Sequence, residues 1–311
     1  MAHDTGRPDT SEMDMTTRAP EVEVFAIFGP TASGKSAVAE ALADRLGTEV
    51  VSADAMQAYR GLPILTNQPE RPTQLVGIWP LAHEGTVGEY QRLAHEAIDE
   101  LVARVGHAVV AGGTGLYLRA ALAELELPPA PPAGARERWE REYDTDPRRA
   151  YRRLVEQDPQ AAERLHPNDR RRVVRALELA EAGVSLVPDE DRLWSAQTRL
   201  PTTIVGLDVP SAELERRIVA RTDEMFTRGV VEEVRQALVG LVSKTADKAL
   251  GLREIASLPP DEARYRIIVH TRQYAAYQRK WMRRIPGLIM VDAMRPLAEV
   301  VDAILQVARA R

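Results

Sequence analysis

The chain has 311 residues, 44% of them apolar, which is enough for one large domain or two ordinary ones around a sizeable core. It has no cysteine, which excludes disulfides and thiolate-bound zinc, and no apolar run of about 18 residues, which a membrane helix requires. Its formal net charge of −5 argues against a general nucleic-acid binder, whose domain is typically basic.

Residues 1–20 are polar and rich in Pro and Thr, and they contain no apolar segment of the kind found in signal peptides. This composition predicts a disordered tail. Without a signal peptide or a membrane span, we expect a soluble cytoplasmic protein. No heptad repeat or apolar stripe requires an oligomer, so we expect a monomer.

Short β-branched or apolar runs predict five buried parallel strands, at residues 22–29, 49–54, 108–113, 202–209 and 287–292. Helical patterns separate them, at residues 35–46, 87–105, 212–240 and 262–284. Strands that alternate with helices predict an α/β fold with a parallel sheet.

One region interrupts this alternation. After the Pro-rich segment LPPAPPAG, at 127–134, a charged helical stretch covers 135–183 and contains no convincing strand. The simplest interpretation is a helical insertion domain, 128–200, on a P-loop NTPase-like core. That core would comprise residues 21–127 and 201–311.

The first predicted strand leads into GPTASGKS, which fits the phosphate-loop pattern G-x-x-x-x-G-K-[ST] between a strand and a helix. The loop consists of Gly29, Pro30, Thr31, Ala32, Ser33, Gly34, Lys35 and Ser36. Its backbone N–H groups and the helix N-terminus would hold phosphate, Lys35 would reach terminal phosphate oxygens, and the Ser36 hydroxyl suits Mg²⁺. Gly47 is predicted to end the helix. The loop predicts nucleotide or diphosphate binding, and ATP is the usual occupant of such a loop.

Two further segments end at the carboxyl edge of the predicted sheet, where ligands of such folds bind. Asp54 stands at the end of the second strand. Three roles are open for it: a carboxylate near a metal ion, a general base, or an ordinary turn residue. Thr114 lies in GGTGLY after the third strand, in a loop that either approaches an anion or is simply a tight turn.

A basic segment lies near the C-terminus, because residues 263–291 include no Asp or Glu. The spacing of Tyr274, Tyr277 and Trp281 favours a core-facing helix stripe over a base-stacking platform. The cations of the segment would then face outward, toward the phosphates of a polyanion. These cations include Arg272, Arg279, Lys280, Arg283 and Arg284.

Six segments in chain order resemble one family, tRNA dimethylallyltransferase, also called tRNA isopentenyltransferase. They are GPTASGKS, SADAMQAYRG, AGGTGLYLRAAL, LHPNDRRRVVRALEL, RRIVARTDEMFTRGVVEEV and TRQYAAYQRKWMRR. The resemblance implies transfer of a dimethylallyl group from dimethylallyl diphosphate to N6 of adenine 37. The acceptors would be tRNAs that read codons beginning with U, bound through the anticodon stem-loop, with Mg²⁺ assisting. The phosphate loop would then hold the leaving diphosphate.

The resemblance also assigns residues. Asp54 would be the general base, and Thr114 and Lys35 would act beside it, with two arginines four apart on one helix, Arg217 and Arg221, reaching the diphosphate. Ser36 would be the metal ligand. The tRNA would be contacted by Asp54, Ala55, Met56, Gln57, Thr114, Arg136, Arg171, Arg172, Val173, Val174 and Arg175.

The chain departs from the family pattern at several positions. Ala55 replaces a common serine, Thr73-Gln74 replaces a frequent His-His pair, and Asn67-Gln68 lacks a usual lysine. The family motif AKRQ-TWFR is altered to AAYQRKWMRR. These changes concern substrate binding, and none of them alters the phosphate loop, Asp54 or Thr114.

Three other functions compete with this prediction. A small-molecule or nucleotide kinase would use the same loop to transfer a γ-phosphoryl group. Prenyl transfer to a free adenine nucleotide is the second, and an RNA-binding P-loop protein without turnover is the third. The long insertion and the basic C-terminal segment favour a large RNA acceptor.

Overall fold

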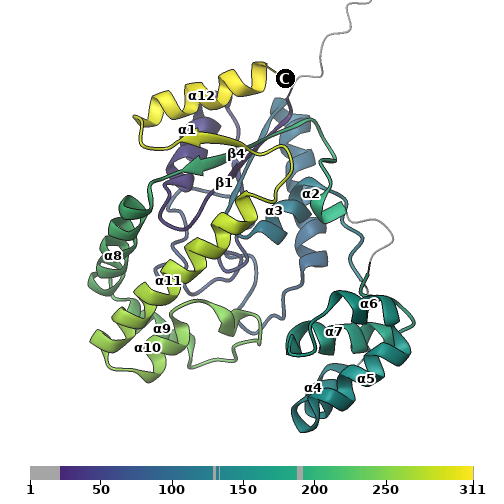
Figure 1. Cartoon of the computed structure of the whole chain (residues 1–311). Helices are drawn as coiled ribbons and strands as arrows, with labels where there is room; N and C mark the ends of the chain where they lie inside the picture. Colours follow the sequence, from purple (N-terminus) through teal and green to yellow (C-terminus); the bar gives the residue numbers. More distant parts are fainter. Residues whose placement is uncertain (1–21, 129–130, 133, 188–191, 311) are drawn as a thin grey trace, which may run out of the picture.

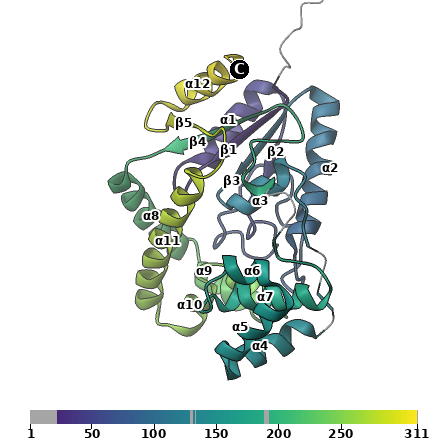
Figure 2. The ribbon, with the colours of Figure 1, turned by 45° about the vertical axis from the view of Figure 1, so that its right-hand side comes forward.

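The computed structural model describes residues 22–128, 131–132, 134–187 and 192–310. Over these ranges five strands form a single parallel sheet at the centre of the larger body (Figures 1 and 2). The strands are β1 (Val24–Phe28), β2 (Val50–Ser52), β3 (Ala108–Gly112), β4 (Thr202–Asp208) and β5 (Ile289–Asp292). Their order across the sheet is β2-β3-β1-β4-β5. The predicted α/β fold with a parallel sheet is confirmed, with all five strands at the expected places.

Helices cover both faces of this sheet. The side chains of β1 alternate: Phe25 and Ile27 pack in a cluster with α1 (Lys35–Leu46) and α12 (Leu297–Arg309). Val24, Ala26 and Phe28 pack in a second cluster with α2 (Val87–Val105) and α3 (Gly115–Leu122). Every residue of β1 is buried, and each large aliphatic or aromatic side chain of this kind contributes about 1.5–3 kcal/mol of burial free energy. The central strand is therefore firmly fixed, and so is the loop that follows it.

The helical insertion lies to one side of the sheet domain (Figure 1). It contains α4 (Ala135–Thr145), α5 (Pro147–Gln157), α6 (Pro159–Arg164) and α7 (Arg170–Glu181). Their apolar side chains form a cluster of their own, which includes Trp139, Leu154 and Leu177. This unit therefore has an apolar core of its own.

The prediction of one helical stretch over 135–183 is too simple. Asp146 and Asp158 each end one helix and begin the next, and each side chain accepts a hydrogen bond from a backbone N–H of the new first turn. Pro147 and Pro159 follow them directly, and proline at the first helical position cannot continue the preceding helix. These Asp-Pro pairs divide the stretch.

The end of the insertion differs from the predicted range of 128–200. Leu186 and Val187 still pack on the insertion cluster, whereas Leu193 and Leu200 pack on the core of the sheet domain. Arg199 donates from its backbone N–H to the carbonyl of Leu122 in α3. The returning segment, including the short helix η1 (Arg192–Trp194), thus packs with the sheet domain.

The remaining helices complete the core. The pattern at 212–240 forms two helices, α8 (Ser211–Thr227) and α9 (Val230–Ala237), because Gly229 adopts a left-handed conformation with φ +90° between them. The 262–284 pattern is α11 (Pro260–Met282). Three helices were not predicted: α3, α12 and α10 (Leu252–Ser257), which follows a short 3₁₀ turn, η2 (Ala246–Lys248). Gly47 ends α1 in the left-handed conformation, as predicted.

The predicted disordered tail, residues 1–20, lies outside the described residues. Within the described ranges, no helix combines the length and the apolar character that crossing a membrane requires.

Candidate active site

The phosphate loop connects β1 to α1 at the carboxyl edge of the sheet. Gly34 has φ +89°, a value that favours glycine, and the N–H of Ser33 donates to the carbonyl of Pro30 (3.1 Å) in a tight turn. This curl directs the N-terminus of α1 into a cavity of about 590 Å³. The loop side of the cavity is lined by Thr31, Ala32, Lys35 and Ser36. The predicted loop geometry is confirmed.

Lys35 is enclosed by protein, although part of its side chain faces the cavity. Burial lowers the pKa of its ammonium group to about 8, the negative charge of Asp54 partly offsets this effect, and the charge of Arg221 adds to it. A bound anion would therefore stabilise the charged form of the Lys35 side chain.

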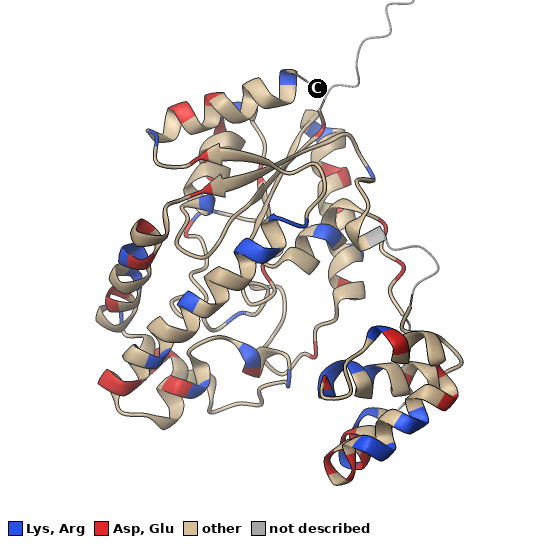
Figure 3. Ribbon diagram, in the orientation of Figure 1, with Lys and Arg blue, Asp and Glu red and all other residues tan. Residues whose placement is uncertain are grey.

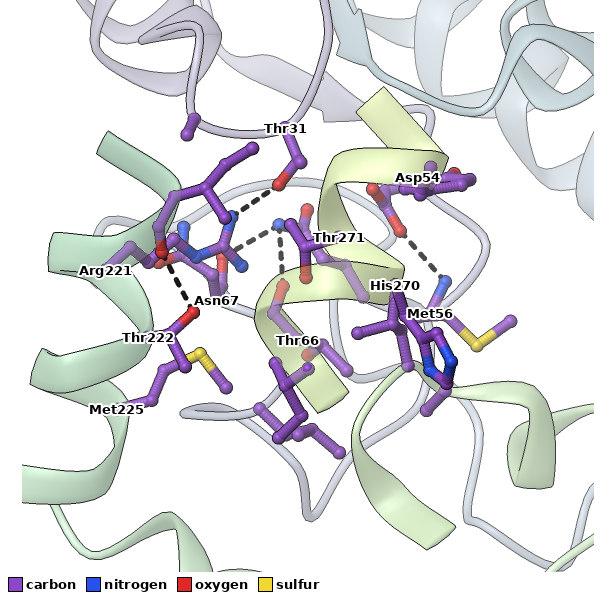
Figure 4. A pocket seen from close by; sticks show the side chains of 18 of the residues that line it. Thr31, Asp54, Met56, Thr66, Asn67, Arg221, Thr222, Met225, His270 and Thr271 are labelled. Carbon is purple, nitrogen blue, oxygen red and sulfur yellow. Dashed lines mark hydrogen bonds between the residues drawn. The ribbon is translucent and has the colours of Figure 1, made fainter. Parts of the chain in front are cut away.

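Arg217 and Arg221, which lie one turn apart on α8, both contact the phosphate loop. Arg221 donates from Nη1 to the Thr31 hydroxyl (2.8 Å), and Arg217 donates from Nη1 to the Ser33 carbonyl (3.4 Å). The Glu213 carboxylate holds the Nε of Arg217 at 2.5 Å. The structure therefore brings both predicted arginines to the loop, and Arg221 also lines the cavity (Figure 4).

Asp54 stands two residues after β2 and lines the same cavity. Its Oδ1 accepts a hydrogen bond from the Met56 N–H (3.0 Å; Figure 4), so the carboxylate also stabilises its own turn. The Gln57 side chain accepts from the Ser52 hydroxyl (2.8 Å) and donates to the Asn67 carbonyl (2.8 Å). Asp54 thus stabilises its own turn and also lines the cavity. Gln57 connects the end of β2 to the loop that contains Asn67.

Thr114 stands at the start of α3, after β3, and faces the cavity. Its Oγ1 lies 3.3 Å from the hydroxyl of Tyr274 on α11. Burial raises the pKa of the Tyr274 phenol to about 12, with the nearby charge of Asp54 adding to the effect, so this phenol stays neutral at physiological pH. Asp54, Thr114 and the phosphate loop therefore share one cavity, although they come from three different strand ends.

The cavity includes residues that the sequence analysis missed. They come mainly from α11 and from the segment around η2: Asp247, Lys248, Ala249, Leu250, Ile267, His270, Thr271 and Gln278. Ile267, Thr271, Tyr274 and Gln278 recur at intervals of three and four residues, which is the spacing of one helix face. Helical periodicity in TRQYAAYQ could have found this face, but the aromatic residues drew attention to positions 274, 277 and 281.

The outer part of α11 differs from the prediction. Tyr277 is 54% exposed, so it does not belong to a core stripe, whereas Trp281 packs against Gly115 and the ring of Trp194. Arg279 donates to the Val209 carbonyl and to the Ser211 hydroxyl, and Arg272 pairs with Glu215. Two of the five cations expected to face a polyanion thus bind protein groups instead. Lys280 and Arg283 are exposed, and Arg284 lies over the Trp194 ring.

The residues expected to contact RNA in the insertion fall into two groups. Arg136 and Arg175 both pair with Glu178, whose side chain is fully buried. Val173 and Val174 are also buried, in the core of the insertion. Arg171 and Arg172 are exposed at the start of α7, and the charged residues of this unit are shown in Figure 3. Both exposed arginines lie at the surface, where Arg172 also pairs with Asp169 (3.6 Å), while the other four residues stabilise the fold.

The insertion approaches the segment of the core that precedes α10. Glu137 on α4 pairs with Lys244 (3.0 Å). Burial lowers the pKa of the Lys248 ammonium group, and the positive charges of Arg171 and Arg136 lower it further. Lys248 lines the cavity, and it experiences the charges of the carboxylates Glu84 and Glu140 as well as those of the two arginines.

Comparison with known proteins adds an independent line of evidence. The family model described as IPP transferase matches residues 57–285. The chain is 40% identical over 286 residues to a tRNA dimethylallyltransferase of Streptomyces coelicolor, which covers 88% of this chain and 91% of the relative. It is 36% identical over 321 residues to the tRNA dimethylallyltransferase of Acidothermus cellulolyticus. This match covers 97% of this chain and 96% of the relative.

Two solved structures are similar as well. The full-length tRNA isopentenylpyrophosphate transferase from Bacillus halodurans has a TM-score of 0.66 at 27% identity and covers 93% of this chain and 98% of its own. A eukaryotic dimethylallyltransferase acting on tRNA has a TM-score of 0.71 at 25% identity, and the match covers 88% of this chain and 74% of that protein's chain.

Proposed function

The chain belongs to the IPP transferase family, and we propose that it transfers a dimethylallyl group from dimethylallyl diphosphate to N6 of adenine 37 in tRNA. Dimethylallyl transfer to tRNA is the activity for which its relatives are named. The acceptors we propose are tRNAs that read codons beginning with U. The observation that carries the proposal is the single cavity in which the phosphate loop, Asp54 and Thr114 meet.

The phosphate loop holds the diphosphate that leaves, rather than an ATP phosphate to be transferred. As the bond from the allylic carbon to oxygen breaks, the diphosphate keeps the electron pair and its negative charge grows. Lys35, Arg221 and the start of α1 are directed at this position, so they stabilise the transition state more than the ground state.

Asp54 completes the reaction on the acceptor side. The lone pair of adenine N6 is delocalised into the ring, so the amine is a weak nucleophile. A carboxylate at N6–H orients the amine and takes its proton as the new bond from nitrogen to carbon forms. Thr114, held by Tyr274, offers a hydroxyl beside it. The adenine must leave its stack to enter the cavity, where Met56 and Gln57 form part of the wall.

A magnesium ion fits this site through Ser36 and the substrate. The Ser36 hydroxyl lies on the first turn of α1 and lines the cavity beside Lys35. No cluster of three or more His, Asp or Glu side chains suited to a metal occurs among the described residues. Magnesium commonly binds with few protein ligands plus substrate phosphate oxygens and water, which matches this donor set. When bound, the ion neutralises charge on the diphosphate.

The tRNA would dock its anticodon stem-loop between the insertion and α11. The exposed Arg171 and Arg172 of the insertion and the exposed Lys280 and Arg283 of the core would contact its phosphates. Since one chain supplies both surfaces and the cavity, we propose that the protein acts as a monomer. We also propose that it acts in the cytoplasm. Sedimentation with and without tRNA tests the monomeric state.

A transfer assay tests the proposal directly. Protein, Mg²⁺ and labelled dimethylallyl diphosphate are incubated with an unmodified tRNA that reads a codon beginning with U, and with the same tRNA carrying guanine at position 37. We expect label in the first RNA and none in the second. Equal labelling of both RNAs would overturn the choice of adenine 37. Transfer from ATP to a small acceptor, with none from the prenyl donor, would indicate a kinase.

A further inference from the structure

The side chain of Gln278 connects the two loops that follow the neighbouring strands β1 and β3. It projects from α11, is 1% exposed, and has both ends of its amide engaged. Its Oε1 accepts a hydrogen bond from the Thr31 N–H (2.7 Å) in the phosphate loop. Its Nε2 donates to the Gly113 carbonyl (2.9 Å) in the loop before Thr114. One amide group thus joins α11 to two loops that lie 247 and 165 residues earlier in the chain.

Glycine at position 113 allows this close contact. A Cβ atom there would lie 2.2 Å from the Gln278 Nε2 and 3.1 Å from the Gly29 carbonyl oxygen, so a side chain would displace the amide from its present position. One turn earlier on the same helix face, Tyr274 contacts Thr114 itself. Helix α11 therefore holds the Thr114 loop at two successive points and the phosphate loop at one. Buried polar groups of this kind are nearly always paired in native structures.

We propose that Gln278 is a positioning residue that sets the separation between the diphosphate cradle and the loop over the acceptor adenine. This inference rests on the proposed roles of those two loops. Transfer requires the allylic carbon and N6 to come within about 3–3.5 Å in line, and misplacement by about 1 Å reduces the rate strongly. Glutamine suits the position because it presents a donor and an acceptor at fixed spacing, which neither leucine nor an ionised glutamate can do.

The test compares Gln278→Leu with Gln273→Leu. The control makes the same chemical change on the same helix, at an exposed position away from both loops. For Gln278→Leu we expect kcat at saturating substrates to fall at least tenfold while the Kd for tRNA stays within twofold. We also expect dimethylallyl diphosphate to bind several-fold more weakly than to Gln273→Leu. Retained tRNA binding shows that the variant has folded.

A second variant separates positioning from simple stability. Glutamate at position 278 can imitate glutamine only while it is protonated, because the neutral carboxyl has both a donor and an acceptor. The ratio of kcat for Gln278→Glu to kcat for the unaltered enzyme should therefore fall as the pH rises from 6 to 9. Dividing by the unaltered enzyme at each pH removes the pH effects that the two enzymes share.

Two results would overturn the inference. The first is a Gln278→Leu enzyme whose kcat and affinity for dimethylallyl diphosphate equal those of Gln273→Leu. The second is a Gln278→Glu ratio that stays constant with pH. If the unaltered protein transferred no prenyl group, the proposed function would fail, and the donor-binding comparison would still decide the role of Gln278.

Discussion

Raising the pH from 7 to 9 should weaken the binding of dimethylallyl diphosphate through Lys35. In the free protein this ammonium group has a pKa of about 8, because it is enclosed next to Arg221. A bound diphosphate brings negative charge to it and raises the pKa, so the complex keeps the proton. The added affinity is therefore fully present below the free pKa, falls as the pH rises above it, and is lost completely only when the pH passes the higher pKa of the complex.

The magnitude follows from the free-protein pKa. With a pKa of about 8, roughly nine-tenths of Lys35 is protonated at pH 7 and roughly one-tenth at pH 9. If only the protonated form binds well, the affinity at pH 9 should be about tenfold lower, or about 1.4 kcal/mol. Proton uptake on binding should rise from near zero at pH 7 to nearly one at pH 9.

Isothermal titration calorimetry measures both quantities. Dimethylallyl diphosphate is titrated at constant Mg²⁺ without tRNA, in two buffers of different ionisation enthalpy, so that proton uptake is obtained separately from affinity. Lys35→Arg is the matched control, because the guanidinium stays charged over this range and should give a nearly flat profile. It also removes any contribution from titration of the ligand.

An affinity that stays constant from pH 7 to 9 in the unaltered protein would refute the reasoning. An equal slope in Lys35→Arg would refute it as well, because the titrating group would then lie elsewhere.

Three further predictions concern the acceptor side. Asp54→Asn keeps an oxygen that accepts from the Met56 N–H but removes the base. We therefore expect kcat to fall about a hundredfold or more while the Kd for tRNA stays within twofold. A nearly normal kcat would exclude Asp54 as the base. Glu178→Leu leaves Arg136 and Arg175 without their shared buried partner, so denaturant unfolding should show a loss of about 2 kcal/mol, and an unchanged midpoint would contradict that role. The Kd for tRNA should rise steeply between 50 and 200 mM salt, because phosphate contacts release counterions, and a flat response would remove the role of the exposed Arg171 and its neighbours.

The local parts of the site could be predicted from the sequence because each depends on residues close together in the chain. The phosphate loop needs Gly34 for its positive φ and a preceding buried strand, and both are visible in GPTASGKS and the apolar run before it. Asp54 and Thr114 were placed correctly for the same reason, since each follows a strand and parallel strands end at one edge. The resemblance to a family then added the reaction.

Contacts between distant segments required the tertiary structure. Nothing near position 278 in the sequence shows that its amide bridges Thr31 and Gly113, or that the Arg136 and Arg175 side chains share one buried carboxylate. Arg279 was expected to face outward, but the carbonyl of Val209 lies within its reach.

What the sequence by itself determined was the strand-to-helix order, the phosphate loop and the strand ends that carry chemistry, because these follow from propensity and from spacing along the chain. Only the tertiary structure decided which cations are exposed and which are paired with a buried carboxylate. It also decided which polar side chain joins the phosphate loop to the loop before Thr114. Those outcomes depend on hydrogen-bond partners far away in the chain, and a buried polar group is satisfied by whichever partner the fold brings to it.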